Sequence, residues 1–270
     1  RAINSSTGVI TIGEDSTGMY YKVDPDNADG RGTNTAIGGG IVNDGKIESA
    51  ANNVIAMSFD SPYGSKTMEN SATTGVIDLQ GQNSTGMFAT GAGTEISINK
   101  TATLSTTASP NINITGTKLT DPGTEKYVGF GLMAKDGATI RAKNNYIKIT
   151  NGSTAVASVG SGSKVEMNGG KIDYTGKGYA LYATPGNTID ISGVKLTLDG
   201  NAVAYERDLA TSFPIITDTN TSIHIKSKDV VVLNVKHASP LNVSSLVSTV
   251  VNSWAGLSTI PTYDAGAINY

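Results

Sequence analysis

The chain has 270 residues, of which 38% are hydrophobic and only 16% charged, and its formal net charge is −3. So small a charge does not favour a nucleic acid or an anionic membrane surface as a partner. The sequence contains no cysteine, which excludes disulfides and cysteine-ligated zinc. No apolar run approaches the roughly 18 residues of a membrane-spanning helix.

A short phrase recurs along the chain: a small residue followed by a bulky apolar one inside a short apolar run. Its clear copies are Thr17-Gly18-Met19-Tyr20, Thr85-Gly86-Met87-Phe88, Phe130-Gly131-Leu132-Met133, Tyr179-Ala180-Leu181-Tyr182 and Asn201-Ala202-Val203-Ala204. Looser copies are Ile55-Ala56-Met57-Ser58 and Thr154-Ala155-Val156-Ala157. Such self-similarity is typical of an elongated stack of similar units with one continuous core.

Two kinds of alternating apolar and polar segment accompany the phrase. One reads Thr139-Ile140-Arg141-Ala142 and then Lys164-Val165-Glu166-Met167, and the other reads Tyr146-Ile147-Lys148-Ile149 and then Lys171-Ile172-Asp173-Tyr174. The segments recur at intervals of 22 to 25 residues. Alternation indicates strands with one buried face, and the Gly and Asn residues between them tolerate the positive φ of sharp corners.

Three short strands per unit predict an all-β fold, a right-handed parallel β-helix with 22–25 residues per coil, loop insertions and a short C-terminal helix. We expect about eleven coils, with the 45 residues from Met87 to Leu132 counted as two units. A helical solenoid is the structural alternative, but 32 glycines and strict alternation argue against it.

Inside the coil, the small residue should leave room for its stacked neighbours. The bulky residues beside it should then form one apolar ladder along the axis, made of Met19, Met87, Leu132, Leu181 and Val203.

The repeat pattern divides the chain in two. Residues 1–235 are expected to form β-helix repeats, as a fragment of something longer, because the chain starts and stops inside the pattern. Residues 236–270 differ, since apolar residues there recur at three- and four-residue spacings from Leu241 to Trp254. This C-terminal segment is predicted to be an insertion or a short helix packed on the stack.

Three segments interrupt the repeat, at residues 24–40, 60–74 and 206–221. Insertions in solenoids become loops on one face, which is often the binding face. We therefore predict binding through these loops, with tolerated decoration as the alternative. Their candidate binding residues are Asp24, Asp26, Asp29, Arg31, Tyr63, Lys66, Arg207 and Phe213.

One of these loops also resembles a calcium site. Asp24, Asp26, Asn27 and Asp29 gather oxygen ligands of the kind that calcium uses, although their spacing is not that of an EF-hand. A solvated acidic loop is the preferred interpretation and calcium is the alternative, so no metal and no cofactor is predicted.

Residues Gly40–Ile47 nearly match the motif of a phosphate-binding loop, but the final hydroxyl residue of that motif is missing. The same Gly-Lys-Ile recurs at Gly170-Lys171-Ile172, so the repeat itself explains the match.

Stacking should bring equivalent residues of successive coils about 5 Å apart. One outward ladder is expected to run through Arg141, Glu166, Asp190 and then His224. Glu166 beside Asp190 would imitate the carboxylate pair of a retaining glycosidase. Since the neighbouring charges alternate in sign, as on a charge-balanced surface, we predict no catalytic residue.

The repeat resembles a known family. Gly75-Val76-Ile77-Asp78 with the following Asn83–Ala89, together with Val42–Ile47, is similar to the repeat of type V autotransporter passengers, above all the giant coaggregation-type adhesins of oral Gram-negative anaerobes. The resemblance covers roughly residues 1–235. It implies a right-handed β-helical passenger at the cell surface, outer membrane-anchored or extracellular, with a C-terminal β-barrel translocator in the full-length protein. It implies no shared catalytic motif.

These observations together predict a cell-surface adhesin passenger fragment rather than an enzyme. It would bind other bacterial or host cells through a surface protein or glycan on the partner cell, without nucleic acid and without direct membrane insertion of this fragment. A polysaccharide-degrading β-helix enzyme, lyase or glycosidase, and a purely structural stalk are the alternatives.

Overall fold

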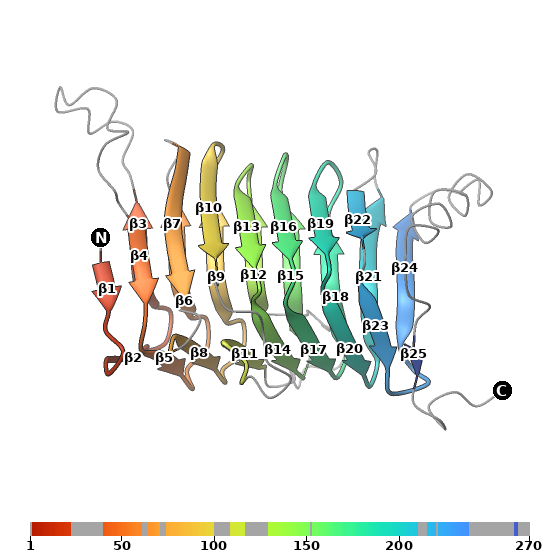
Figure 1. Cartoon of the computed structure of the whole chain (residues 1–270), viewed down its shortest axis with the longest axis horizontal. Coiled ribbons are helices and arrows are strands. Elements are labelled where there is room, and N and C mark those ends of the chain that lie inside the picture. The colour runs from red at the N-terminus through yellow and green to blue at the C-terminus, as the bar shows by residue number, and fades with distance from the viewer. Residues whose placement is uncertain are drawn as a thin grey trace.

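The computed structural model describes residues 2–22, 40–60, 64–70, 74–99, 109–116, 129–151, 153–209, 215–219, 221–237 and 262–263. All helices and strands that occur within these residues are β-strands. They form three parallel sheets, here called sheets A, B and C. Figure 1 shows the strands side by side along the long axis of the molecule.

The three sheets draw their strands from the whole chain. Sheet A contains β1 (Ala2–Asn4), β4 (Gly40–Asn43), β7 (Gly64–Asn70), β10 (Thr94–Asn99), β13 (Thr139–Lys143), β16 (Lys164–Asn168), β19 (Thr188–Ser192) and β22 (Ile215–Thr219). Sheet B contains β2 (Val9–Thr11), β5 (Lys46–Ser49), β8 (Val76–Leu79), β11 (Ile112–Thr115), β14 (Tyr146–Thr150), β17 (Lys171–Thr175), β20 (Lys195–Asp199), β23 (Ser222–Ile225) and β25 (Thr262–Tyr263). Sheet C contains β3 (Thr17–Lys22), β6 (Ile55–Asp60), β9 (Thr85–Thr90), β12 (Phe130–Lys135), β15 (Thr154–Val159), β18 (Gly178–Ala183), β21 (Ala202–Leu209) and β24 (Val231–His237).

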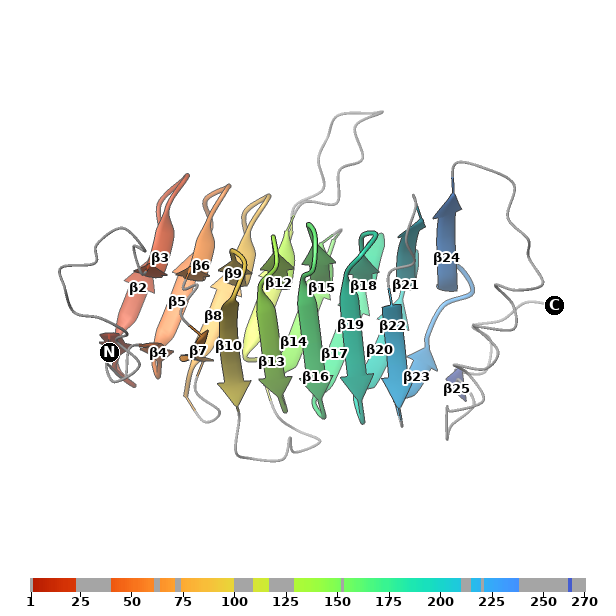
Figure 2. The same ribbon diagram turned by 90° about the horizontal axis from the view of Figure 1, so that it is seen from above.

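The chain visits the three sheets in turn. Strands β1, β2 and β3 make the first coil, and β4, β5 and β6 pair in parallel with them as the second. The pattern continues to β24, so the described residues form eight three-stranded coils. Figure 2 shows the coils following one another from the N-terminal end to the C-terminal end. The prediction of an all-β parallel β-helix is confirmed.

The expected number of coils is wrong. Met87 of β9 and Leu132 of β12 are direct neighbours in register, so the 45 residues between them build one coil and not two. Residues 100–108 and 117–128, which lie outside the described residues, join the strands of that coil. At about 4.8 Å per strand spacing, the eight coils extend over roughly 34 Å.

The core consists of columns of like residues. The bulky column runs through Met19, Met57, Met87, Leu132, Val156, Leu181 and Tyr205, all of them buried. The predicted ladder is therefore confirmed except at Val203, which lies opposite Tyr179. Tyr205 takes the expected place of Val203, because 24 residues separate it from Leu181, its neighbour in the preceding coil. Alternation alone cannot distinguish two apolar positions that are two residues apart.

A column of small residues runs beside the bulky column. It contains Gly18, Ala56, Gly86, Gly131, Ala155, Ala180 and Ala204. A Cβ atom added to Gly131 would lie 2.6 Å from the carbonyl oxygen of Ala155 and 2.7 Å from Cγ2 of Ile147. The small residue thus gives room to the next coil, as the sequence predicts, and also to the facing sheet B.

The corner between sheets A and B is held by a ladder of buried asparagines. Asn4 donates from Nδ2 to Oδ1 of Asn43 at 2.8 Å, and Asn43 donates in the same way to Asn70 at 2.7 Å. Asn70 donates to the backbone carbonyl of Asn111 at 2.7 Å, and Asn111 donates to Oδ1 of Asn145 at 3.3 Å. All five side chains are at most 8% exposed, so the ladder satisfies polar groups that water does not reach.

The corners also bear out the expected role of glycine. Gly169 and Gly193 occupy equivalent corners of neighbouring coils and have φ values of 65° and 63°. The helix predicted for the C-terminal segment falls on residues 241–254, which lie outside the described residues.

Gly131→Ala should destabilise the β-helix. The added methyl group would meet a backbone carbonyl and a buried isoleucine, and overpacking of a core costs about 1–3 kcal/mol in unfolding free energy. Denaturant unfolding measures this loss. Gly13→Ala is the matched control, because nothing lies within 4 Å of a Cβ at exposed Gly13. Equal stability of the two variants would contradict the role assigned to the small column.

Asn43→Ala should destabilise the chain by about 1–3 kcal/mol, because it leaves the buried Oδ1 of Asn70 without its donor. Thermal unfolding, compared with that of the parent, reports the effect. Asn201→Ala serves as control, since Asn201 is exposed and lies outside the ladder. A loss no larger than in this control would show that the ladder does not stabilise the corner.

Candidate functional site

Most of the residues predicted to bind lie outside the described residues: Asp24, Asp26, Asp29, Arg31, Tyr63 and Phe213. For Lys66 and Arg207 the structure describes the backbone but not the side chain. Lys66 lies in strand β7 and Arg207 in strand β21, so the expectation that they belong to loops is wrong. Strand β7 shows no alternation in the sequence because Met68 is its only apolar residue.

Two of the three predicted insertions are wrong as bounded, because residues 60–74 contain strand β7 and residues 206–221 contain strand β22. From each of the three, one part that lies outside the described residues attaches to the β-helix along a common edge. Residues 23–39, 61–63 and 210–214 each follow a strand of sheet C and precede a strand of sheet A. Their attachment points therefore share the corner that borders sheet A. Residues 100–108 and 117–128, which the sequence did not single out, attach at the other two corners.

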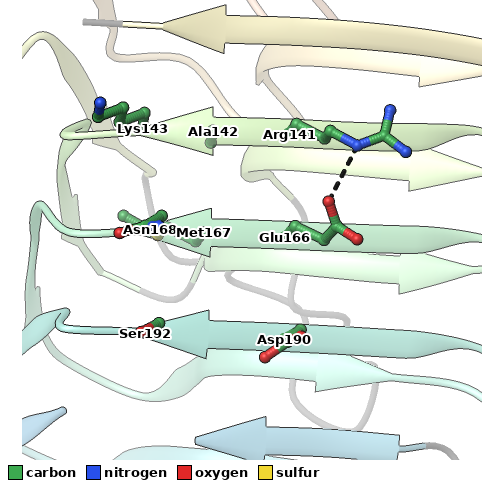
Figure 3. Close-up of a pocket in the computed structure, with 8 residues that line it drawn as sticks. All are labelled: Arg141, Ala142, Lys143, Glu166, Met167, Asn168, Asp190 and Ser192. Carbon is green, nitrogen blue, oxygen red and sulfur yellow. Dashed lines mark ion pairs between the residues drawn. The ribbon is translucent and has the colours of Figure 1, made fainter. Parts of the chain in front are cut away.

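The outer face of sheet A carries a shallow groove of about 350 Å³ across β13, β16 and β19. Two rows of side chains line it, as Figure 3 shows. The first, here called the charged row, is Arg141, Glu166 and Asp190, and the second, here called the open row, is Lys143, Asn168 and Ser192. The nearly buried Ala142 and Met167 lie between the rows.

The charged row is a network of ion pairs. Arg141 lies 3.0 Å from a carboxylate oxygen of Glu95 and 3.0 Å from one of Glu166. Nζ of Lys164 lies 2.5 Å from the second oxygen of Glu166. The hydrogen bond from Lys164, assisted by Arg141, lowers the pKa of Glu166, and the hydrogen bond to Glu95 raises the pKa of Arg141.

Glu166 and Asp190 are neighbours in register, as the sequence predicts. Their environment does not suit a glycosidase acid, which needs a raised pKa, because two cations hold Glu166 ionised.

The expected continuation of this ladder to His224 is wrong. Asp190 is followed by Thr217 of β22, and His224 lies opposite Thr197 in sheet B. Strand β22 falls inside residues 206–221, which the sequence analysis treats as an insertion, and this shifted the assignment by one strand.

The open row differs from the charged row in its contacts. The side chains of Lys143, Asn168 and Ser192 form no hydrogen bond or ion pair within the part of the chain that the structure describes. Lys143 and Asn168 are exposed and Ser192 is half-buried. Lys143 and Asn168 are 25 residues apart, and Asn168 and Ser192 are 24 apart, which equals the spacing of the strands. The row could therefore be found from the sequence, but the sequence does not show whether its side chains have partners.

A second polar cluster lies on the outer face of sheet B. Tyr146 donates its hydroxyl to Oδ2 of Asp173 at 2.5 Å, and Nζ of Lys171 lies 2.6 Å from the same oxygen. Lys171 also lies 4.8 Å from the centre of the Tyr146 ring. Burial, followed by the hydrogen bond to Asp173, raises the pKa of Tyr146. The hydroxyl and the ammonium thus share Oδ2 of Asp173, whereas the buried Oδ1 of the same carboxylate has no hydrogen-bond partner among the described residues.

The near match to a phosphate-binding loop belongs to the repeat. Gly40–Ile47 covers β4, a corner and the start of β5, which supports its interpretation as part of the repeat. A Cβ on Gly45 would meet carbonyl oxygens of Gly8 and Ser5, so packing at the corner explains this glycine. The calcium alternative at residues 24–29 falls outside the described residues.

In the part of the chain that the structure describes, no three His, Asp or Glu side chains gather as metal ligands. Nor does that part of the chain contain a helix that is both long and apolar enough to cross a membrane.

Comparison with known proteins gives no relative: no protein-family model, no curated protein and no solved structure matches this chain. The groove therefore has to be interpreted from its own chemistry.

Glu166 should stabilise the fold more at neutral than at acid pH. Its pKa in the folded chain lies below the ordinary value of 4.5, so its contribution is complete above that value and is lost as the pH falls through the lowered pKa. For so exposed a network we expect about 0.2–1 kcal/mol. Unfolding free energies of the parent and Glu166→Gln should therefore differ at neutral pH and converge in acid.

Glu14→Gln, which changes an exposed turn residue, is the control for this pH series. A difference between the parent and Glu166→Gln that stays constant from neutral to acid pH would contradict the assigned ion pairs.

Proposed function

We propose that this chain is part of a cell-surface adhesin, outer membrane-anchored or extracellular, that binds other bacterial or host cells. The observation that carries the proposal is the open row. It presents three polar side chains that have no partner among the described residues, in a groove of about 350 Å³ on the fifth to seventh of the eight coils. Lys143 and Asn168 are exposed and Ser192 is half-buried, so their donors and acceptors are accessible to an external partner.

The attachment of the insertions supports the same side of the molecule. Residues 23–39, 61–63 and 210–214 join the chain at the edge of sheet A, whose outer face carries the groove. The open row ends strands β13, β16 and β19 at the opposite edge of this face, so a partner would have to cross the face to reach both. The partner proposed is a protein or a glycan on the surface of another cell.

Two other functions compete with this proposal. A polysaccharide-degrading enzyme would need an acid and a base of separated pKa, and the groove instead holds Glu166 ionised between Arg141 and Lys164. A purely structural stalk would need no unengaged polar row, so the open row favours binding. The resemblance of the repeat to autotransporter passengers supports the proposed location.

Surfaces coated with the folded chain should retain partner cells in a panel of bacterial and host cell types. Heat-unfolded chain at the same coating density is the control, because it keeps the composition and loses the groove. Retention that requires the folded chain is expected. Equal retention by both coatings, or none by either, would contradict the adhesin and favour the stalk.

The same preparation tests the enzyme. Incubation with acidic and neutral polysaccharides should release no new reducing or unsaturated ends. Release that disappears in Glu166→Gln would establish the enzyme in place of the adhesin.

A further inference from the structure

We propose that the groove on sheet A binds a short oligosaccharide that carries a single carboxylate, with the carboxylate at Lys143 and the neutral sugar units toward Ser192. This inference rests on the proposed function as an adhesin and names the ligand class of that site.

The open row offers the donors and acceptors that a saccharide uses. Lys143 supplies an ammonium, Asn168 a carboxamide and Ser192 a hydroxyl, in this order along the axis. The strand spacing places them about 4.8 Å apart. A saccharide chain that lies along the axis presents hydroxyl groups at short, regular intervals, so it can meet all three side chains at once.

The charges of the groove give the ligand a direction. Both cations, Arg141 and Lys143, lie on β13, and both carboxylates, Glu166 and Asp190, lie on β16 and β19. Since Arg141 already bridges two carboxylates, Lys143 is the cation that is open to an anionic group. A carboxylate at the β13 end is therefore attracted, whereas a polyanion would place further negative charge toward the carboxylate of Asp190.

The geometry disfavours a peptide and an apolar ligand. An extended peptide binds by adding to an unpaired strand edge, but β16 pairs with β13 on one side and β19 on the other. An apolar ligand needs a hydrophobic floor, and Ala142 and Met167 are only 3% and 1% exposed.

The lining of the groove predicts weak binding by each single site. No aromatic ring is among the described residues that line it, so specific affinity has to come from hydrogen bonds and one ion pair. Adhesion between cells does not require more, because many copies on one surface act together.

Calorimetric or NMR titration of the folded chain with 3′-sialyllactose and with lactose tests the inference. The two sugars share the lactose unit, and the first also carries one carboxylate. We expect tighter binding of 3′-sialyllactose, and in Lys143→Gln a loss of about two- to fivefold that brings it to the level of lactose. The matched control is Lys148→Gln, which removes the same charge from an exposed position on sheet B and should leave binding unchanged.

Asn168→Ala should weaken both sugars, because it removes a contact to the neutral units. Equal affinity of the parent for the two sugars, or equal effects of the two lysine variants, would overturn the inference. Retention of cells without binding of 3′-sialyllactose would overturn the inference and leave the adhesin standing. Binding of 3′-sialyllactose without retention of cells would support the groove and contradict the adhesin.

Discussion

Parallel pairing in register is the constraint on which the rest of this structure depends. Every residue lies about 4.8 Å from its counterpart in the next coil, so a side chain must suit its own equivalents more than its sequence neighbours. The clearest result is a column in sheet B: Ile10, Ile47, Ile77, Ile112, Ile147, Ile172, Leu196 and Ile223. Identical shapes stack without voids, and a change in one coil is felt by both neighbours.

The same constraint has opposite effects on polar residues at the corners and on the faces. At the corner of sheets A and B, identical asparagines are an advantage because each amide both donates and accepts, so Asn4, Asn43 and Asn70 can be buried together. On the outer face, identical charges would repel. In the charged row Arg141 therefore lies beside Glu166. Because Arg141 and Lys164 neutralise Glu166, a second carboxylate, Asp190, can occupy the next coil.

The architecture was predictable because alternation and a constant period are both visible between Thr139 and Asp199. Prediction failed where one of the two signals is lost. Strand β7 lacks alternation, the 45-residue coil between Met87 and Leu132 lacks the period, and Val203 and Tyr205 offer two equivalent registers. The groove could be located from the register, but which of its side chains form ion pairs depends on reach and rotamer, which sequence spacing does not specify. Most of the predicted binding residues belong to segments outside the described residues.

Stacking also limits the chemistry that a face of this β-helix can offer a partner. Like charges in neighbouring coils repel, although sheet B does place Glu48 beside Asp78 and Lys171 beside Lys195. Two forms of row occur at the groove: one in which opposite charges pair with each other, and one in which a single charge is followed by neutral groups. The charged row takes the first form and the open row takes the second, with Lys143 before Asn168 and Ser192. Only the second form leaves donors for a ligand. Because such a row holds a single charge, its affinity is modest, and specificity follows from the order of the groups along the axis.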